Sequence, residues 1–485
     1  MSKTAHNRFI PCNRADMAAR GWNELDVLFV TGDAYIDHPA FGTSLLARLL
    51  EAEGVKVGIL AQPDWRDPEA LRVMGRPRLF AAVSAGAMDS MVNHYTAAKK
   101  VRNDDAYTPG GRSGARPNRA VIAYTAAVKG AFKGLPTVVG GIEASLRRLA
   151  HYDYWDNKVR RSVLVDSKAD LLLFGMAETA LLALAKRMLA GEAFETITDL
   201  RGTAFLAKTV PDNAVILPSF EEVSSSTDAY NKAFKLAAEE KNPFSGKILL
   251  QAHGNRQLVV NPPASPLEES QLDRIYALPF TKLPHPSYRE PIPAYAQIKF
   301  SITSHRGCCG GCAFCAITHH QGKTIQSRSE QSVREELDLL SRHPEFRGTV
   351  TDVGGPTANM YGMRCSDRQA QAVCRRESCL YPQVCRHLDT HDDRAVALLR
   401  KLRQHTAIKH LFVASGIRFD LLNHQPFRGK MPGINQRDAK PFRLTGIMVL
   451  DITSDQNISA LAMGGLQQAS TTTATEGHFM YRAAR

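Results

Sequence analysis

Four cysteines stand within eight residues, at Cys308, Cys309, Cys312 and Cys315, and thiolates this close together bind metal ions or iron–sulfur clusters. Counted from Cys309, the spacing Cys-x2-Cys-x2-Cys would suit a bacterial ferredoxin run. That run needs a further cysteine and a proline where this chain has His319 and His320. Counted from Cys308, the spacing is Cys-x3-Cys-x2-Cys. We therefore predict that Cys308, Cys312 and Cys315 hold three irons of a [4Fe–4S] cluster, which leaves the fourth iron open to a chelating substrate, and that Cys309 is not a ligand.

A structural zinc site is the alternative for the same loop, with His319 or His320 as the fourth ligand. Three features favour iron. Glycines at 307, 310 and 311 let the backbone approach a cluster, a strand-like run precedes the loop, and the downstream sequence suits a barrel.

The elements around the loop follow the order of a β/α barrel. A predicted strand at 296–303 leads into the loop, and Val333, Leu337 and Leu340 recur at helical spacing within 330–341. A second strand, 349–353, then ends at Gly354 and Gly355. In such barrels the carboxyl ends of the strands carry the active site. A third predicted strand is 410–414.

The cysteine motif, with Phe314 beside its last cysteine, resembles the signature of radical S-adenosylmethionine (SAM) enzymes. The resemblance implies that SAM chelates the open iron and that an electron from the reduced cluster cleaves it. It also implies that Phe314 lies against the adenine and that the backbone at Gly354 and Gly355 receives the SAM amino group. Pro356 stands where these enzymes often have an acidic residue.

Three longer stretches, 355–361, 374–385 and 413–420, resemble the YgiQ-type radical SAM family, and residues 25–425 read like that family throughout. The resemblance implies a radical SAM enzyme of unknown reaction and substrate, supplied by an electron donor such as flavodoxin or ferredoxin. It also implies further barrel strands after 423, and these are absent from the sequence.

A second group of cysteines follows in a basic segment, at Cys365, Cys374, Cys379 and Cys385. Their intervening lengths of eight, four and five residues match no common zinc finger. The four could hold an auxiliary iron–sulfur cluster or a zinc ion, or they could be plain thiols.

The N-terminal part alternates apolar strands, such as 26–30 and 55–60, with amphipathic helices, such as 45–52. This alternation predicts a doubly wound parallel sheet, with ligands at the carboxyl ends of its strands. The domain resembles the cobalamin-binding domain of many radical SAM enzymes, whose signature is Asp-x-His-x2-Gly. Here His38 directly follows Asp37, and Gly42 comes four residues later. Cobalamin bound without a protein ligand and a domain that has lost the cofactor both remain open, and Glu143 is either a cleft residue or a buried, capped carboxylate.

The whole chain is predicted to be α/β, with an N-terminal doubly wound parallel sheet followed by a partial (β/α) radical SAM barrel. The predicted domains are an N-terminal α/β domain (1–255), a proline-rich connection (256–295), a radical SAM core (296–423) and an atypical, possibly disordered tail (424–485). The altered tail leaves open whether the barrel is active.

Composition agrees with a large enzyme in a reducing compartment. The chain has 485 residues, 44% of them hydrophobic, and nine cysteines, eight of which lie between 308 and 385. We expect a cytoplasmic protein, because no export signal or membrane span is visible. The net charge of +13 allows contact with nucleic acid, but no long basic run indicates it. The alternative to an enzyme is a non-catalytic iron–sulfur or zinc-binding protein with a basic surface.

Overall fold

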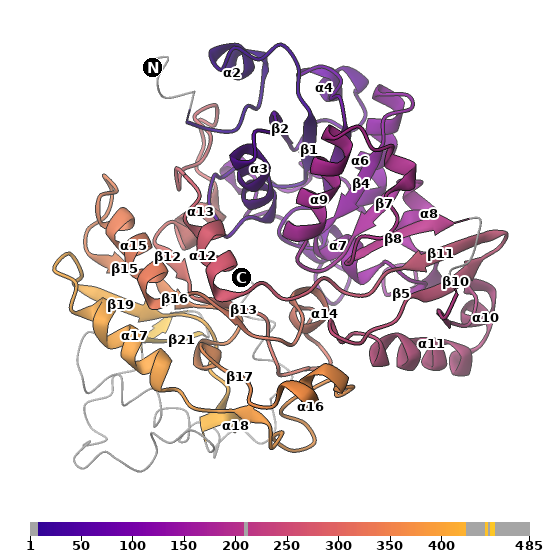
Figure 1. Ribbon diagram of the computed structural model, residues 1–485. Coiled ribbons are helices and arrows are strands. Elements are labelled where there is room, and N and C mark those ends of the chain that lie inside the picture. Colours follow the sequence, from indigo (N-terminus) through magenta and orange to yellow (C-terminus); the bar gives the residue numbers. More distant parts are fainter. Residues whose placement is uncertain (1–7, 208–211, 423–441, 445–446, 452–485) are drawn as a thin grey trace. The chain divides into compact units, whose positions relative to one another are not determined.

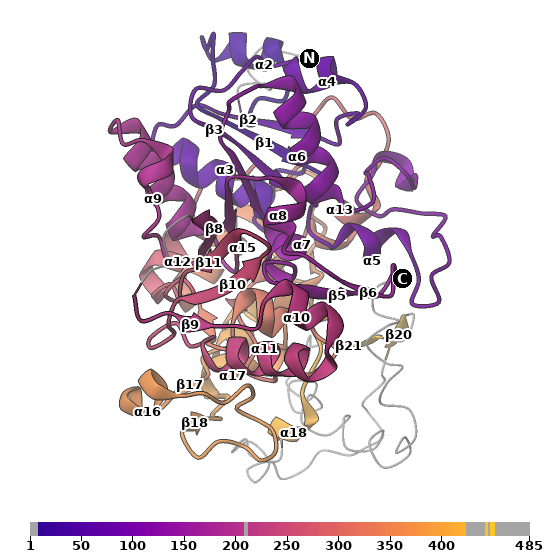
Figure 2. The ribbon, with the colours of Figure 1, turned by 90° about the vertical axis from the view of Figure 1, so that its right-hand side faces the viewer.

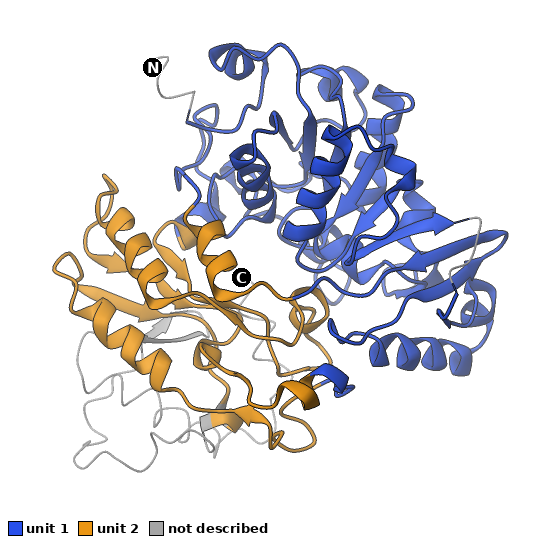
Figure 3. Cartoon of the chain, viewed as in Figure 1, with its two compact units in different colours: residues 1–265, 278–296, 372–377 blue, residues 266–277, 297–371, 378–485 orange. Residues whose placement is uncertain are grey.

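The computed structural model describes residues 8–207, 212–422, 442–444 and 447–451. The chain divides into two compact units, coloured separately in Figure 3. Unit 1 contains residues 1–265, 278–296 and 372–377, and unit 2 contains 266–277, 297–371 and 378–485. The predicted connection 256–295 is therefore shared between the units. Its first residues form β11 (Arg256–Val260), a strand of the unit 1 sheet, and Glu269–Tyr276 form helix α12 of unit 2.

Unit 1 is built on a nine-stranded sheet, whose strands lie in the order β2-β1-β3-β4-β7-β8-β11-β10-β9. Its parallel part contains β1 (Val27–Thr31), β2 (Val57–Ala61), β3 (Phe80–Ser84), β4 (Thr137–Gly140) and β7 (Leu171–Leu173). The order of these five strands is that of flavodoxin-like doubly wound sheets. The prediction of a parallel sheet in an α/β chain is confirmed for this part.

Alternate residues of β1 show why helices cover both faces. Leu28 and Val30 pack in one apolar cluster with Val121 and Val128 of α6 (Ala120–Ala131). Val27 and Phe29 pack in the other cluster, with residues of α3 (Gly42–Ala52) and α9 (Glu178–Leu189). Strand side chains point alternately to the two faces, so both faces of this buried strand must be apolar. Figures 1 and 2 show the helices on either side of the sheet.

Beyond β7 the sheet changes direction. The strands β8 (Thr203–Ala207), β10 (Leu249–His253) and β11 pair antiparallel, and β9 (Val215–Ile216) pairs parallel with β10 at the edge. This antiparallel extension was not predicted. Strands β10 and β11 are joined by a two-residue turn that contains Gly254 in a left-handed conformation, and such a turn is typical of a β-hairpin.

Unit 2 holds three successive β/α elements. Strand β12 (Ser301–Thr303) pairs parallel with β16 (Asp352–Gly354), and β15 (Thr349–Val350) pairs parallel with β19 (His410–Val413). The helices α15 (Glu330–Ser341) and α17 (Asp393–Arg403) share one apolar cluster with these strands. The predicted helix 330–341 therefore coincides with α15, which Ser329 caps by accepting a hydrogen bond from the Ser332 amide.

Two details differ from the predicted strands. The run 296–303 is not a strand throughout, because α13 (Pro293–Ile298) occupies its first residues and β12 begins at Ser301. Proline is favoured in the first turn of a helix, and Pro293 stands at that position. After β19 come the short helix α18 (Phe419–Leu422) and then the strands β20 (Phe442–Leu444) and β21 (Ile447–Asp451), and β21 pairs antiparallel with β19. The rest of the predicted tail, 424–485, lies outside the described residues.

Candidate iron–sulfur site

The cysteine loop and the glycine pair lie side by side at the carboxyl ends of two neighbouring strands. Thr303, the last residue of β12, is in register with Gly354, the last residue of β16. The Ser304 amide then donates a hydrogen bond to the Gly354 carbonyl at 2.7 Å. Loops at this edge of parallel strands are where β/α proteins bind ligands. The two sequence features, about forty residues apart, thus meet as the barrel pattern predicted.

The loop is closed at its base by a short hairpin. Strands β13 (His305–Arg306) and β14 (Gln326–Ser327) pair antiparallel, and the Cys308 amide donates to the Gly322 carbonyl at 3.1 Å. Gly307 has φ of +83°, and a Cβ atom there would lie 2.2 Å from the Thr324 carbonyl oxygen. Only glycine fits this turn, which directs the chain into the cysteine loop.

The three predicted ligands and Arg418 form one electrostatic group. Burial raises the pKa of the Cys315 thiol, and charge on Cys308 or Cys312 raises it further. The Arg418 guanidinium donates to Cys312 Sγ at 2.9 Å. A Cβ atom on Gly310 would lie 2.6 Å from Arg418 Nη1 and 3.4 Å from Cys308 Sγ. The glycine therefore lets the guanidinium approach the thiols, and a cation there favours the thiolate form that binds metal.

Cys309 points to different partners. Its Sγ lies 3.8 Å from Met360 Sδ, and its pKa is raised well above the usual value, first by a hydrogen bond with Cys379 and then by burial. The Cys379 amide also donates to the Cys309 carbonyl at 2.9 Å. This arrangement suits the spacing that starts at Cys308.

Phe314 is exposed to solvent, whereas the backbone of Gly354 and Gly355 is closely packed. Phe314, predicted to lie against adenine, is 68% exposed. A Cβ atom on Gly354 would lie 2.2 Å from Ser415 Oγ, and one on Gly355 would lie 2.5 Å from the His305 carbonyl oxygen. The backbone at the glycine pair is thus packed tightly against His305 of β13 and against the turn after β19.

Two residues hold this edge, the buried His305 and the half-buried Asp352. Burial lowers the pKa of His305 to about 4, and its Nε2 lies 2.9 Å from the Thr357 carbonyl while Nδ1 lies 2.9 Å from Ser304 Oγ. Asp352 accepts hydrogen bonds from the Ser415 hydroxyl at 2.7 Å and from two amides after β19. The carboxyl ends of β12, β16 and β19 are therefore joined by side chains as well as by strand pairing.

The second group of cysteines is not brought together as one site. Cys365 lies in β17 (Arg364–Cys365), and its Sγ contacts the Asp367 carbonyl at 3.3 Å. The Cys385 amide donates to the Cys379 carbonyl at 2.7 Å, and Cys374 falls in the short segment assigned to unit 1. Across the part of the chain that is described, ligand atoms of three Cys, His, Asp or Glu residues come within 4.8 Å of one another only at Cys12, Asp16 and His285. By this measure the thiols of Cys308, Cys312 and Cys315 share one loop but are not closed into a ligand set either.

The cobalamin expectation can be tested at the loop after β1. His38 is buried, and its Nδ1 accepts a hydrogen bond from the Ala40 amide at 3.1 Å. Asp37 is held by the buried Arg48 guanidinium, whose Nε lies 3.0 Å from Asp37 Oδ1. Both residues of the altered signature are therefore engaged within unit 1, and they do not fit the role of a cobalt ligand and its acidic partner.

The switch point between β1 and β3, where flavodoxin-like sheets bind ligands, is filled by side chains of the same unit. Arg116 forms ion pairs at 2.9 Å with both Asp33 and Asp105, and all three are buried. A Cβ atom on Gly32 would lie 2.2 Å from the Ala85 carbonyl oxygen. Glu143 is the buried, capped carboxylate of the second alternative, because it accepts from the Ser90 amide at 2.9 Å and the Val121 amide at 3.0 Å.

Sequence reasoning did not select Arg418, Thr357 or His305. Arg418 stands in the stretch 413–420 that carried the family resemblance, which was a usable signal. Thr357 and His305 sit two or three residues from predicted site residues, and only the strand register shows that they face each other.

Comparison with known proteins agrees with these features. The sequence profile described as Radical SAM N-terminal matches residues 9–301. A UPF0313 protein of Geobacter sulfurreducens is 58% identical over 421 residues, covering 86% of this chain and 70% of the relative. The chain belongs to the UPF0313 family of radical SAM proteins. A UPF0313 protein of Bradyrhizobium diazoefficiens is 48% identical over 443 residues. This chain spans 66% of that relative, so it represents about two thirds of the length of these family members.

Among solved structures, the UPF0313 chain is similar to the radical SAM methyltransferase TsrM from Kitasatospora setae, in complex with tryptophan substrate and a SAM analogue. The match has 13% identity and a TM-score of 0.39, and it covers 82% of this chain and 56% of TsrM. A second TsrM structure, with cobalamin and a [4Fe–4S] cluster bound, matches at a TM-score of 0.36. Within the described residues, no helix is both long enough and apolar enough to cross a membrane.

Proposed function

We propose that this UPF0313 protein is a radical SAM enzyme that holds a [4Fe–4S] cluster on Cys308, Cys312 and Cys315 and uses SAM as co-substrate. The observation that carries the proposal is the register of β12 with β16, which sets the three-cysteine loop beside Gly354 and Gly355 at one strand edge. When reduced, such a cluster supplies the electron that cleaves the sulfonium of SAM and starts radical chemistry on an organic substrate.

The residues present fit that group. Three thiols on one loop leave one position of a four-iron cluster for a ligand that is not protein, since such clusters otherwise take four cysteines. The Arg418 guanidinium donates to Cys312 Sγ, so it offsets part of the negative charge that three thiolates would bring together. Its own pKa is raised, foremost by its hydrogen bond with Asp420, and it stays charged at any physiological pH.

The glycine pair would present backbone rather than side chain to the amino acid part of SAM. Gly355 packs against His305, whose ring is neutral at pH 7 because burial lowers its pKa to about 4. The link from His305 Nε2 to the Thr357 carbonyl holds the turn 355–357 beside the cysteine loop. The exposed Phe314 ring is available to stack on the adenine, as the superfamily resemblance implies.

Single Cys→Ser variants test the ligand set, with iron and sulfide counted per chain after anaerobic reconstitution. We expect that Cys308→Ser, Cys312→Ser and Cys315→Ser each lose most of the cluster. Cys309→Ser is the matched control, because Cys309 stands in the same loop but its Sγ contacts Met360. The proposal is wrong if Cys309→Ser loses the cluster while Cys308→Ser keeps it. Zinc in place of iron in the reconstituted chain would favour the non-catalytic alternative.

A further inference from the structure

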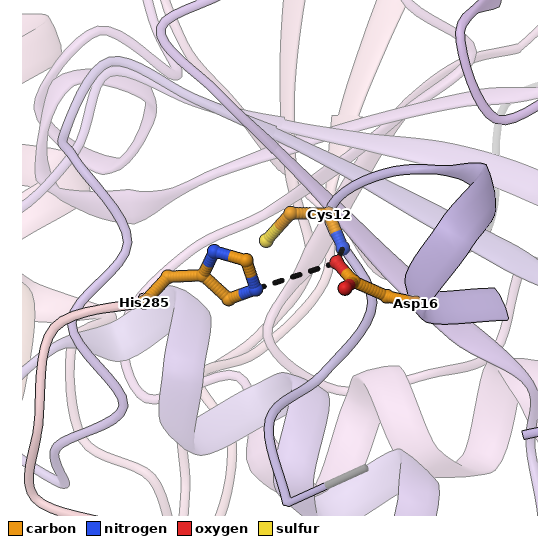
Figure 4. A group of neighbouring side chains, drawn as sticks. All are labelled: Cys12, Asp16 and His285. Carbon is orange, nitrogen blue, oxygen red and sulfur yellow. Dashed lines mark hydrogen bonds and ion pairs between the residues drawn. The ribbon is translucent and has the colours of Figure 1, made fainter. Parts of the chain in front are cut away.

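A second group of metal-ligand side chains lies in unit 1, outside every residue assigned above. Cys12, Asp16 and His285 point toward one another, as Figure 4 shows, and their ligand atoms all lie within 4.8 Å of one another. We propose that these three residues bind one divalent transition-metal ion, with zinc as the metal that this donor set fits best. A thiolate, a carboxylate and an imidazole are all ordinary zinc ligands, and three protein ligands leave a fourth position for water or a substrate atom.

The measured separation suits a tetrahedral ion. Asp16 Oδ2 and His285 Nε2 lie 3.3 Å apart. Two ligands at about 2.0 Å from a tetrahedral zinc ion are roughly 3.3 Å from each other, given the usual Zn–N and Zn–O lengths. Zn–S bonds are longer, near 2.3 Å, so a thiolate ligand belongs somewhat further from the other two. The group can therefore close on an ion with small side-chain movements.

The imidazole has the outer contact that a metal-binding histidine needs. His285 Nδ1 lies 2.9 Å from Ser287 Oγ, and it accepts a hydrogen bond from the Ser287 amide at 3.3 Å. With a metal ion on Nε2, Nδ1 would carry the ring proton and donate it to Ser287 Oγ. The Tyr35 ring stacks on the imidazole with 5.9 Å between ring centroids, and the Phe9 ring meets it edge-on. Contacts on both sides fix the plane of the ring.

The carboxylate is also held in place. The Cys12 amide donates to Asp16 Oδ2 at 3.0 Å, and the Asp16 amide donates to Asn13 Oδ1 at 3.0 Å at the start of α2 (Arg14–Ala19). The side chains of Asp16 and His285 are only 2% and 1% exposed. A buried carboxylate beside a buried imidazole is an ordinary donor pair for a divalent cation.

The geometry argues against a nucleophilic Cys–His–Asp relay. In such a relay the carboxylate contacts the imidazole nitrogen that does not face the nucleophile, so that it orients the ring. Here the carboxylate faces Nε2, while Nδ1 faces Ser287. The Cys12 thiol lies next to the Ile10 carbonyl, 3.6 Å away, and its pKa is raised well above the usual value, first by burial. A thiol with a raised pKa is a poor nucleophile unless a metal ion displaces its proton.

A metal ion at this position would join two parts of unit 1 that are far apart in the sequence. Residues 12–16 would be tied to the segment 278–296, which returns to unit 1 after the excursion into unit 2. The Ile36 and Pro284 backbones form an isolated bridge in the same region. The ion would therefore fasten the returning segment to the start of unit 1 at α2, beside the point where the bridge joins it to the loop after β1.

The test uses the full-length chain after anaerobic cluster reconstitution, titrated with Zn²⁺ alone and, separately, with Co²⁺ alone. We expect one zinc per chain in addition to the iron, and tetrahedral Co²⁺ absorption bands with a thiolate charge-transfer band. Cys12→Ser and His285→Gln should abolish both while leaving the iron content unchanged. His94→Gln, which changes another histidine of unit 1 outside the group, should behave like the wild type.

X-ray absorption at the zinc edge of the wild-type chain keeps the test independent of how the variants fold. The expected shell has one sulfur near 2.3 Å and nitrogen or oxygen ligands near 2.0–2.2 Å. No bound zinc, a shell of three or four sulfurs, or zinc retained by Cys12→Ser would each overturn the proposal. A sulfur-rich shell would place the zinc on cysteines between 308 and 385, and would count against the iron–sulfur proposal as well. Iron lost while the zinc shell is as expected would count against the iron–sulfur proposal alone.

Discussion

Replacing Gly355 by alanine should loosen the strand edge that carries the proposed cluster and SAM sites. The new Cβ atom would lie 2.5 Å from the His305 carbonyl oxygen and 2.7 Å from both Cε1 and Nε2 of its ring. The carbonyl belongs to the backbone, and the ring is held by its Nε2 contact with the Thr357 carbonyl at 2.9 Å. Neither can give way as a flexible side chain would, so either the turn after β16 or strand β13 must shift.

Overpacking of this kind typically costs about 1–3 kcal/mol. If the free energy of opening of unit 2 falls by this amount, amides of β12 and β16 should exchange with solvent roughly 5 to 150 times faster, since each 1.4 kcal/mol changes the opening equilibrium about tenfold. Hydrogen–deuterium exchange followed by mass spectrometry measures this change. All three tryptophans, Trp22, Trp65 and Trp155, lie in unit 1, so their fluorescence shows whether that unit stays folded.

Gly416→Ala is the matched control. Gly416 also follows a parallel strand of unit 2, but a Cβ atom there would meet nothing within 4 Å, and its φ is not in the left-handed region. We expect exchange in this variant to equal the wild type or to slow slightly, because alanine reduces the freedom of the unfolded chain. Equal exchange in Gly355→Ala and Gly416→Ala would refute the packing of Gly355 against His305 of β13.

Three further changes have definite expected outcomes. Arg328→Met should lower the stability of unit 2 by about 3–5 kcal/mol, seen as faster amide exchange, because the buried Glu336 carboxylate loses its ion pair. Adding Glu336→Leu to this variant should restore most of the lost stability, because no buried charge is then left without a partner. Burial raises the pKa of Asp33 to about 6, so its stabilisation of unit 1 is present below about pH 4 and is lost as the pH rises through 6. Urea unfolding followed by tryptophan fluorescence should show that the free energy of unfolding falls by ~3 kcal/mol over this range, and Asp33→Asn should lack this fall. Ser415→Ala should destabilise β16 by about 1–3 kcal/mol in exchange experiments, since the Asp352 carboxylate loses a hydrogen bond.

Local patterns predicted the elements that position the cluster loop. Helix α15 was predicted with its observed ends, because Val333, Leu337 and Leu340 mark one face and Ser329 is a good cap. The strand ending at Gly354 was found because a run rich in β-branched residues ends at glycine, and the strand ending at Val413 because a short apolar run stands before Ser415. The meeting of the cysteine loop with the glycine pair followed from the general rule for parallel strands.

Contacts between distant residues could not be predicted in this way. Nothing in the spacing of Cys309 and Cys379 indicates that their thiols meet, because helix α15 and the strands β15 and β16 lie between them in the chain. The buried partners of Arg116 come from two different loops, and Cys12 and His285 are 273 positions apart. The sequence therefore gave the chemistry of single motifs, whereas pairing across the fold needed three-dimensional structure.

Electron paramagnetic resonance of the reconstituted and reduced chain, recorded with and without SAM, tests the central claim most directly. If Cys308, Cys312 and Cys315 leave one iron open, a [4Fe–4S] signal should appear and should change when SAM is added. A [4Fe–4S] signal that SAM leaves unchanged would contradict the claim that SAM binds this cluster. The absence of any cluster signal would contradict the iron–sulfur assignment itself.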